Sequence, residues 1–235
     1  MPRPRGAKPS PRHRLASALP HRIVSPTPPQ WLWLPKRLSM WLNGTLGVCV
    51  TAEEAFAKAC NNPEIFITDG SVLAWAAANN VLNGAELTQV LDQMQHDGLQ
   101  QDGSIYNDGP PSSVDWTNTT ALQNAIAQGP VKIGVAADQL ENVVPNPPTN
   151  GWFATGFQPD TNLDHCVSLC GYGTVEWLAT QLGMNPLSGG EIVDGTAPAY
   201  ALFTWDSIGI IDVPSLLAIT GEAWLRSPTT VAVKA

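Results

Sequence analysis

A cysteine stands at the predicted start of a helix. The run from Cys49 to Cys60 carries apolar side chains at helical spacing, and the glycines at Gly44 and Gly47 mark a turn before it. The partial positive charge at a helix N-terminus favours a thiolate over a thiol, and the thiolate is the nucleophilic form. Free cysteine is also among the most buried residue types, so packing as a small apolar side chain is the alternative interpretation.

Nucleophilic chemistry at a thiol needs further groups elsewhere in the chain. A cysteine hydrolase requires an imidazole within hydrogen-bond reach, a group that orients it, and donors for the oxyanion. His165 opens a predicted strand far downstream, and Asn43 lies six residues before Cys49 with a carboxamide that can donate. Taken alone, His165 is better interpreted as a partly buried structural histidine.

Charged residues divide the chain into two unlike parts. Eight of the twelve Lys and Arg residues precede residue 41, whereas all twenty Asp and Glu residues follow it. Residues 1–30 are rich in Pro and Arg and predict a disordered basic arm, because they offer too little apolar surface to bury. Such an arm can contact nucleic acid, acidic lipid or the acidic body, or remain a solvated tail. The acidic remainder, 31–235, argues against nucleic-acid binding and favours cationic or neutral substrates.

The cysteines predict neither a disulfide scaffold nor a metal centre. Cys49 and Cys60 would lie about 16 Å apart along a helix, beyond disulfide reach, so we expect reduced thiols. His96 and His165 accompany the cysteines without CxxC spacing, so we expect no metal and no other cofactor. No apolar run approaches the ~18 residues of a membrane span and no signal-peptide pattern is recognised. We expect a soluble monomer, and the sequence does not indicate its compartment.

Helices are predicted to come first and strands after. Helical patterns cover about 71–79, 85–96 and 120–128, and strand patterns cover 131–137, 163–173 and 199–205. Residues 98–118 predict a loop and 214–226 a helix. The lack of βαβ alternation indicates an α+β fold in one catalytic domain, with a helical part at about 40–128 and a strand-rich part at about 129–235.

These elements and two motifs resemble the papain-like cysteine peptidases. Cys49 at a helix start matches the family nucleophile, and Asn43 falls where the family has its oxyanion-hole glutamine. The stretch LDHCVSLCGYG at 163–173 is similar to the family's histidine motif. The resemblance covers about residues 40–205 and is closest to divergent bacterial and phage-associated members. It implies an N-terminal helical subdomain, with the nucleophile helix at its centre, packed against a C-terminal antiparallel sheet.

The sequence also departs from the family pattern. In LGVCV at 46–50, the family's neighbouring cysteine and tryptophan are missing. The family's Asn-Ser-Trp-Gly appears only as FTWD at 203–206, without the asparagine. We therefore predict that Asp206 orients His165, with Asp164 as the alternative, because a carboxylate can accept from imidazole Nδ1–H.

The resemblance implies a cysteine hydrolase that cleaves peptide or amide bonds through a thioester intermediate. His165 would take the proton of Cys49, and Asn43 with the backbone N–H of Cys49 would hold the oxyanion. Peptides or proteins are then the expected substrates. Two alternatives stay open: an amine-accepting acyl transferase that uses the same site, and a catalytically inactive papain-like binding module.

Overall fold

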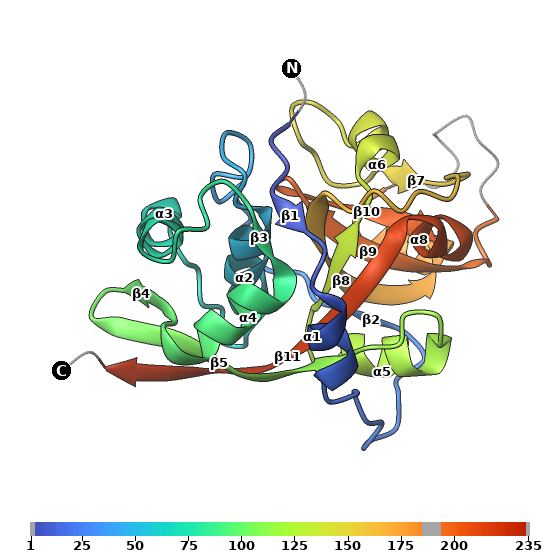
Figure 1. Ribbon diagram of the computed structural model, residues 1–235. Helices are drawn as coiled ribbons and strands as arrows, with labels where there is room; N and C mark the ends of the chain where they lie inside the picture. The colour runs from blue at the N-terminus through green and yellow to red at the C-terminus, as the bar shows by residue number, and fades with distance from the viewer. Residues whose placement is uncertain (1–2, 185–193, 234–235) are drawn as a thin grey trace.

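The structure has a helical part and a sheet part (Figure 1), and is a computed structural model that describes residues 3–184 and 194–233. The helices are α1 (Arg12–Ser17), α2 (Cys49–Ala59), α3 (Asp69–Ala78), α4 (Leu87–His96), α5 (Thr119–Gln128), α6 (Asp138–Val143), α7 (Val175–Gln181) and α8 (Val213–Ile219). The strands are β1 (Ala7–Lys8), β2 (Trp31–Leu32), β3 (Ala85–Glu86), β4 (Leu99–Gln101), β5 (Ser104–Ser113), β6 (Val131–Val135), β7 (Phe153–Ala154), β8 (His165–Thr174), β9 (Pro198–Thr204), β10 (Ser207–Asp212) and β11 (Thr220–Val233).

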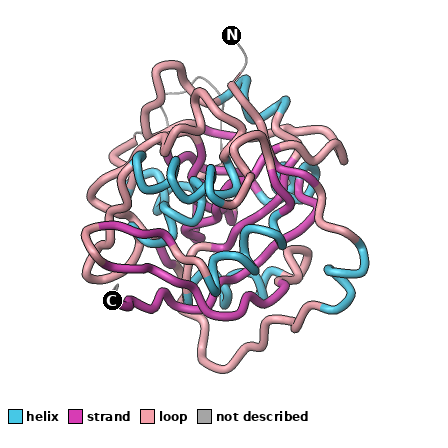
Figure 2. Tube along the Cα trace, turned by 60° about the vertical axis from the view of Figure 1, so that its left-hand side comes forward, coloured by secondary structure: helices cyan, strands magenta, loops and turns pink. Residues whose placement is uncertain are grey.

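Most strands of the described chain belong to one sheet. Its order is β4-β5-β11-β6-β8-β9-β10-β7, with β2 also paired to β8. All of its pairings are antiparallel except that of β10 with β7. The long β5–β11 ribbon runs beneath α4 in the view of Figure 1, and Figure 2 shows that the chain ends on a strand at the C-terminus. The predicted α+β class with an antiparallel sheet is confirmed.

Two hydrophobic cores lie on opposite faces of the sheet, and β8 contributes to both. Cys166 and Cys170 face the helical core around α2, whereas Val167 and Leu169 face the core that α5 covers. This alternation follows from the two-residue period of a strand. It places the beginning of β8 at the junction of the helical and sheet parts.

Two segments differ from the sequence prediction. The predicted loop at 98–118 contains β4 and β5, and the predicted helix at 214–226 is limited to α8, after which β11 begins. β11 pairs with β5 on one side and β6 on the other. Strand formation here depends on partners far away in sequence, and local propensity does not report them.

The N-terminal arm also differs from the prediction, because residues 3–30 lie ordered on the body. Ser10 N–H donates to Glu222 Oε1 at 3.0 Å, and the Tyr172 hydroxyl donates to the Pro28 carbonyl at 2.8 Å. In Figure 1 the arm, in dark blue, runs between the helical part and the sheet part before it reaches α1. Hydrogen bonds to the body replace the core that the arm cannot form by itself.

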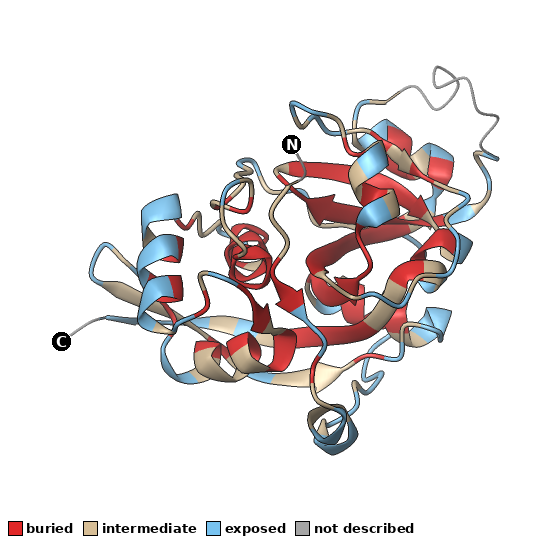
Figure 3. Ribbon diagram, turned by 45° about the horizontal axis from the view of Figure 1, so that its top comes forward, coloured by how far each residue is buried: buried red, intermediate tan, exposed pale blue. Residues whose placement is uncertain are grey.

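Helix α2 is buried on nearly every side (Figure 3), as expected for a nucleophile helix at the centre of the helical part. From the sequence, Glu53, Glu54 and Lys58 are available to solvent or to polar partners, and Thr51 and Glu54 have capping-box spacing. All three charged side chains are 0% exposed, and the helix has no side-chain N-cap. Charges from the sheet pair with Glu54 and Lys58, as described below.

Candidate active site

Cys49 is the first residue of α2, and it is 0% exposed. Burial raises the pKa of Cys49 to about 11. Backbone hydrogen bonds from Gly6, Cys166 and Val50 oppose the shift only in part. In this conformation the sulfur is therefore a neutral thiol at neutral pH, because desolvation outweighs the helix N-terminus that led us to expect a thiolate.

His165 opens β8 and is held by the hairpin that joins β9 to β10. Its Nε2 lies 2.9 Å from the Thr204 hydroxyl oxygen, and the Trp205 ring stacks on the imidazole with 4.3 Å between centroids. Its Nδ1 has no hydrogen-bond partner among the described residues, although the side chain is fully buried. The ring is thus fixed in orientation and keeps one nitrogen free for proton transfer. Cys166, the next residue, places this strand end against the Cys49 thiol.

A strained turn positions the groups around the imidazole. Thr204 pairs with Ser207, and the two residues between them, Trp205 and Asp206, have φ values of 45° and 63°. Two positive φ values are typical of a type I′ hairpin, which favours glycine or asparagine. Holding tryptophan there costs on the order of 1–3 kcal/mol, and such strain clusters at functional sites.

The side chain that contacts the His165 imidazole is Thr204, and not Asp206, which we predicted to orient it. Asp206 is at the tip of the turn and is not a hydrogen-bond partner of His165 in the described structure. Burial raises the pKa of Asp206, and nearby Asp69 raises it further. Sequence reasoning missed Thr204, and its only signal was a hydroxyl directly before Trp205 in FTWD.

Asn43, the predicted oxyanion donor, lies in the turn that precedes α2. It is 1% exposed, and its Oδ1 has no partner among the described residues. Two left-handed residues, Trp41 and Leu42, set the turn, and the Asn43 N–H donates to the Met40 carbonyl at 2.9 Å. The carboxamide is therefore enclosed near the start of α2, and its oxyanion role remains a prediction.

Residues 3–10, which we call the covering segment, pass over the thiol. The Gly6 backbone hydrogen bonds to Cys49, and the Gly6 carbonyl accepts from Ala85 N–H at 2.8 Å. On the other side, Ala7 N–H donates to the Asp164 carbonyl at 3.1 Å. β1 thereby pairs in parallel with β3 and bridges both walls of the site. The covering segment excludes solvent from Cys49.

Two arginines of the covering segment flank the imidazole. Arg5 Nη1 donates to Asp164 Oδ2 at 2.7 Å, and its guanidinium also pairs with Asp138 and Glu141. The Arg3 guanidinium carbon lies 4.9 Å from the centroid of the Trp205 ring. Asp164, our alternative for orienting the histidine, is thus engaged by Arg5 instead.

These arginines also change the charge state of the catalytic candidates. Burial, together with the positive charges of Arg5 and Arg3, lowers the pKa of His165 to about 3. With the thiol of Cys49 also neutral, the thiolate–imidazolium pair cannot form while the covering segment is in place.

A buried network of charges supports α2 from the sheet side. Glu54 pairs with Lys132 of β6 and, at 2.7 Å, with Nε of Arg226 of β11. Lys58 donates to both carboxylate oxygens of Asp108 at 2.9 Å. Buried ion pairs of this kind fix the geometry of an element more than they add stability, and loss of one partner is strongly destabilising.

We expect Glu53→Gln to stabilise the protein at alkaline pH. Both carboxylate oxygens of Glu53 lack a partner among the described residues, and burial raises its pKa from 4.5 to about 8 against the opposing effects of Ser168, Arg226 and Lys132. The unfolded chain ionises near pH 4.5, so the wild type loses about 1.4 kcal/mol of unfolding free energy per pH unit up to the folded pKa. Glutamine stays neutral in both states.

The measurement is urea denaturation at pH 4.5 and at pH 8. Glu53→Gln should nearly match the wild type at the lower pH and exceed it by about 4 kcal/mol at the higher pH. Glu176→Gln, at an exposed position of α7, is the matched control and should change neither value. A pH dependence that is identical in Glu53→Gln and wild type would contradict the assignment.

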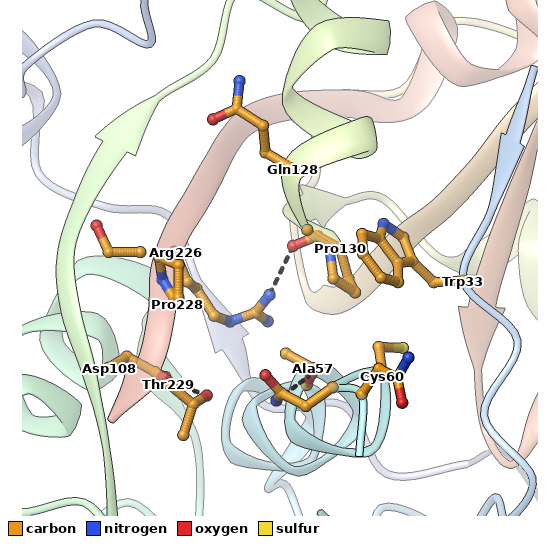
Figure 4. Close-up of a pocket in the computed structure, with 13 residues that line it drawn as sticks. Trp33, Ala57, Cys60, Asp108, Gln128, Pro130, Arg226, Pro228 and Thr229 are labelled. Carbon is orange, nitrogen blue, oxygen red and sulfur yellow. Dashed lines mark hydrogen bonds between the residues drawn. The ribbon is translucent and has the colours of Figure 1, made fainter. Parts of the chain in front are cut away.

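The pocket in Figure 4 lies at the other end of α2. It encloses about 290 Å³ and is lined by residues that include Cys60, Arg226 and Trp33. Arg226 there donates to the Pro130 carbonyl at 2.9 Å. Because α2 rises about 1.5 Å per residue, this pocket is separated from Cys49 by roughly the length of the helix.

The described ranges, 3–184 and 194–233, contain neither a metal-binding cluster nor a membrane-spanning helix. No three His, Cys, Asp or Glu side chains gather there in a way that would hold a metal ion. None of the helices in these ranges is long and apolar enough to cross a membrane. All four cysteines are free, in agreement with the reduced thiols expected from their spacing.

Solved structures with a similar fold are cysteine proteases. Amb a 11, a ragweed pollen cysteine protease solved in its proform, gives a TM-score of 0.63 at 12% identity and covers 92% of this chain and 72% of its own. Procathepsin L 3 from the larval midgut of Tenebrio molitor gives a TM-score of 0.62 at 10% identity. The match covers 90% of this chain and 74% of the procathepsin. The fold is papain-like. Xylellain, a cysteine protease from Xylella fastidiosa, has the same fold with a TM-score of 0.62 at 12% identity. The match covers 97% of the present chain and 98% of xylellain.

The likeness is one of structure alone. No family model matches the sequence, and no curated protein matches it significantly. At identities of 10–12%, the papain-like fold is shown, and any activity must be argued from the residues of this chain.

Proposed function

We propose that the chain is a cysteine hydrolase that cleaves peptide or amide bonds. One arrangement carries the proposal. A cysteine at a helix N-terminus adjoins a strand that opens with a histidine, whose Nε2 is engaged by Thr204 and whose Nδ1 is free of protein partners. Nucleophile, base and orienting group are the three parts that thiol catalysis requires. The cysteine proteases that share the papain-like fold support this assignment.

The reaction begins when the covering segment leaves the site. His165 Nδ1 takes the proton from Cys49 Sγ, and the thiolate attacks the substrate carbonyl carbon. The backbone N–H of Cys49 and the Asn43 carboxamide stabilise the oxyanion. The C–N bond breaks as the imidazolium returns its proton to the leaving amine, which leaves a thioester on Cys49. Water, deprotonated by His165, then hydrolyses the thioester and releases the acid.

The test compares the wild type with Gly6→Val, a variant argued in the Discussion to lift the covering segment. A mixture of peptides is incubated with each protein, and products are identified by mass spectrometry with and without an added primary amine. We expect cleavage by Gly6→Val and free carboxylic acids as products. Amide products with the added amine would instead favour acyl transfer, and no product from either protein would contradict the proposal.

A second candidate is a papain-like module that binds without catalysis. The buried, neutral thiol of Cys49 and the absence of the family's asparagine favour it. The two candidates differ in the titration of Cys49 once the covering segment is displaced. A depressed thiol pKa in Gly6→Val indicates a catalytic pair, whereas a pKa that stays above the usual range indicates the binding module.

Thr204→Val should lower the cleavage rate of the open variant about 10- to 100-fold. Valine has nearly the shape of threonine but offers no partner for His165 Nε2, so the imidazole loses its fixed orientation. The measurement is kcat on one cleaved peptide. Asp206→Asn is the matched control on the same turn, and it should retain activity within about twofold. A larger loss in Asp206→Asn than in Thr204→Val would restore the aspartate as the orienting residue.

A further inference from the structure

The covering segment shows which side chain fits beside the catalytic pair. Asp138 and Glu141 of α6 converge with Asp164, the residue before His165, and we call these three residues the acidic recess. The Arg5 guanidinium is seated in the recess and contacts all three carboxylates. An acidic cluster alone has many explanations, but here a cationic ligand already occupies it.

The recess is partly shielded from water, so its ion pairs can distinguish a cationic side chain from a neutral one. The side chains of Glu141 and Asp164 are 18% and 28% exposed, and that of Arg5 is 19% exposed. Asp138 is 69% exposed and contributes less, because solvent screens it. A planar guanidinium matches two carboxylates at once, which a neutral side chain cannot do.

The recess belongs to the same surface as the reacting groups. Asp164 directly precedes His165, and Trp205, which stacks on His165, lies under the Arg3 guanidinium. His165 is itself completely buried with Nδ1 unpaired, and the Arg5 guanidinium that fills the recess is close enough to lower the pKa of the imidazole. Arg5 stands one residue from Gly6, which lies over the thiol.

We propose that the acidic recess is a substrate subsite for an arginine side chain on the leaving-group side of the scissile bond. This rests on the proposed function. The leaving-group side is assigned because His165 must protonate the leaving amine. The part of the substrate after the scissile bond therefore lies against His165. Substrates then carry arginine within the first two residues after the cleaved bond. The acidic body attracts such peptides as well.

The test uses the full chain with Arg5→Ala and Gly6→Val together, which vacates the recess. Two peptides differ only after the scissile bond, one with arginine and the other with citrulline, its uncharged isostere. We expect kcat/KM to be at least about tenfold higher for arginine, and the ratio to shrink at high salt. Adding Glu141→Gln should remove most of the preference by lowering kcat/KM for the arginine peptide. Equal kcat/KM for the two peptides would overturn the subsite.

A binding experiment separates failure of the subsite from failure of the enzyme assignment. Cys49→Ala is added to the Arg5→Ala and Gly6→Val variant, and this protein is titrated with fluorescently labelled forms of the arginine and citrulline peptides. Tighter binding of the arginine peptide that depends on Glu141 would support the recess even if no peptide were cleaved. Cleavage without any arginine preference would overturn the recess and leave the hydrolase assignment in place. Binding that does not distinguish the two peptides would also overturn the recess.

Discussion

Cys49→Ala in the Gly6→Val background is expected to lower peptide cleavage by at least about 10³-fold. The substitution removes the atom that forms the thioester, and the groups that remain supply only binding and oxyanion stabilisation. The substitution should leave the fold intact, since alanine in place of the fully buried Cys49 leaves only a small cavity in the helical core. The measurement is the initial rate of product formation.

Cys60→Ala is the matched control for this loss. Cys60 lies beyond the other end of α2, is 8% exposed and lines the pocket of Figure 4. It lies on the same helix axis with a similar degree of burial but has no role in the proposed chemistry. We expect the peptide-cleavage rate of Cys60→Ala in the Gly6→Val background to stay within about twofold of that of Gly6→Val alone. Equal losses in the two variants would mean that a packing defect, and not loss of the nucleophile, explains the effect.

Gly6→Val is expected to raise the rate at which iodoacetamide alkylates Cys49 by at least about 10²-fold at neutral pH. A Cβ on Gly6 would lie 1.9 Å from the Gly47 carbonyl oxygen and 2.5 Å from its carbon. Both are backbone atoms, so the covering segment must move away. The thiol then regains solvent, and its pKa falls from about 11 toward the range of an ordinary thiol at a helix N-terminus.

The sign of the pH dependence follows from the thiolate. Below its pKa the thiolate fraction of Cys49 rises tenfold per pH unit, so wild-type alkylation should still be increasing in strongly alkaline solution, whereas Gly6→Val should level off earlier. Peptide mass spectrometry resolves Cys49 from the other three cysteines. Gly70→Val is the matched control: Gly70 is exposed, and the nearest atom to its added Cβ is Thr68 Oγ1 at 3.9 Å. Equal alkylation in Gly6→Val and wild type would show that the segment does not cover the thiol in solution.

The helix that starts at Cys49 and the strand that starts at His165 could be predicted from the sequence because their signals are local. Turn glycines, helical spacing and the histidine motif are all readable within about ten residues. The orienting group could not be predicted in this way. Thr204 reaches His165 only because β8 and β9 pair in one particular register, and a two-residue turn places Trp205 on the ring. Register depends on long-range pairing.

The charges of α2 and the strand β11 show the same limit. The sequence leaves Glu54 open to solvent or to a polar partner, because Lys132 and Arg226, with which it pairs, belong to strands that are distant along the chain. β11 looks like the continuation of a helix until β5 and β6 supply its neighbours. In each case tertiary partners override the local pattern.

By itself, then, the sequence determined the α+β class and the nucleophile and base candidates, Cys49 and His165. Only the tertiary structure decided that Thr204 holds the imidazole and that the basic arm is ordered. The arm lacks apolar surface and would remain disordered alone, as its composition predicts. The carboxylates of the acidic recess and the backbone around Cys49 provide the hydrogen bonds and opposite charges that order it, and these partners are assembled only by the complete fold.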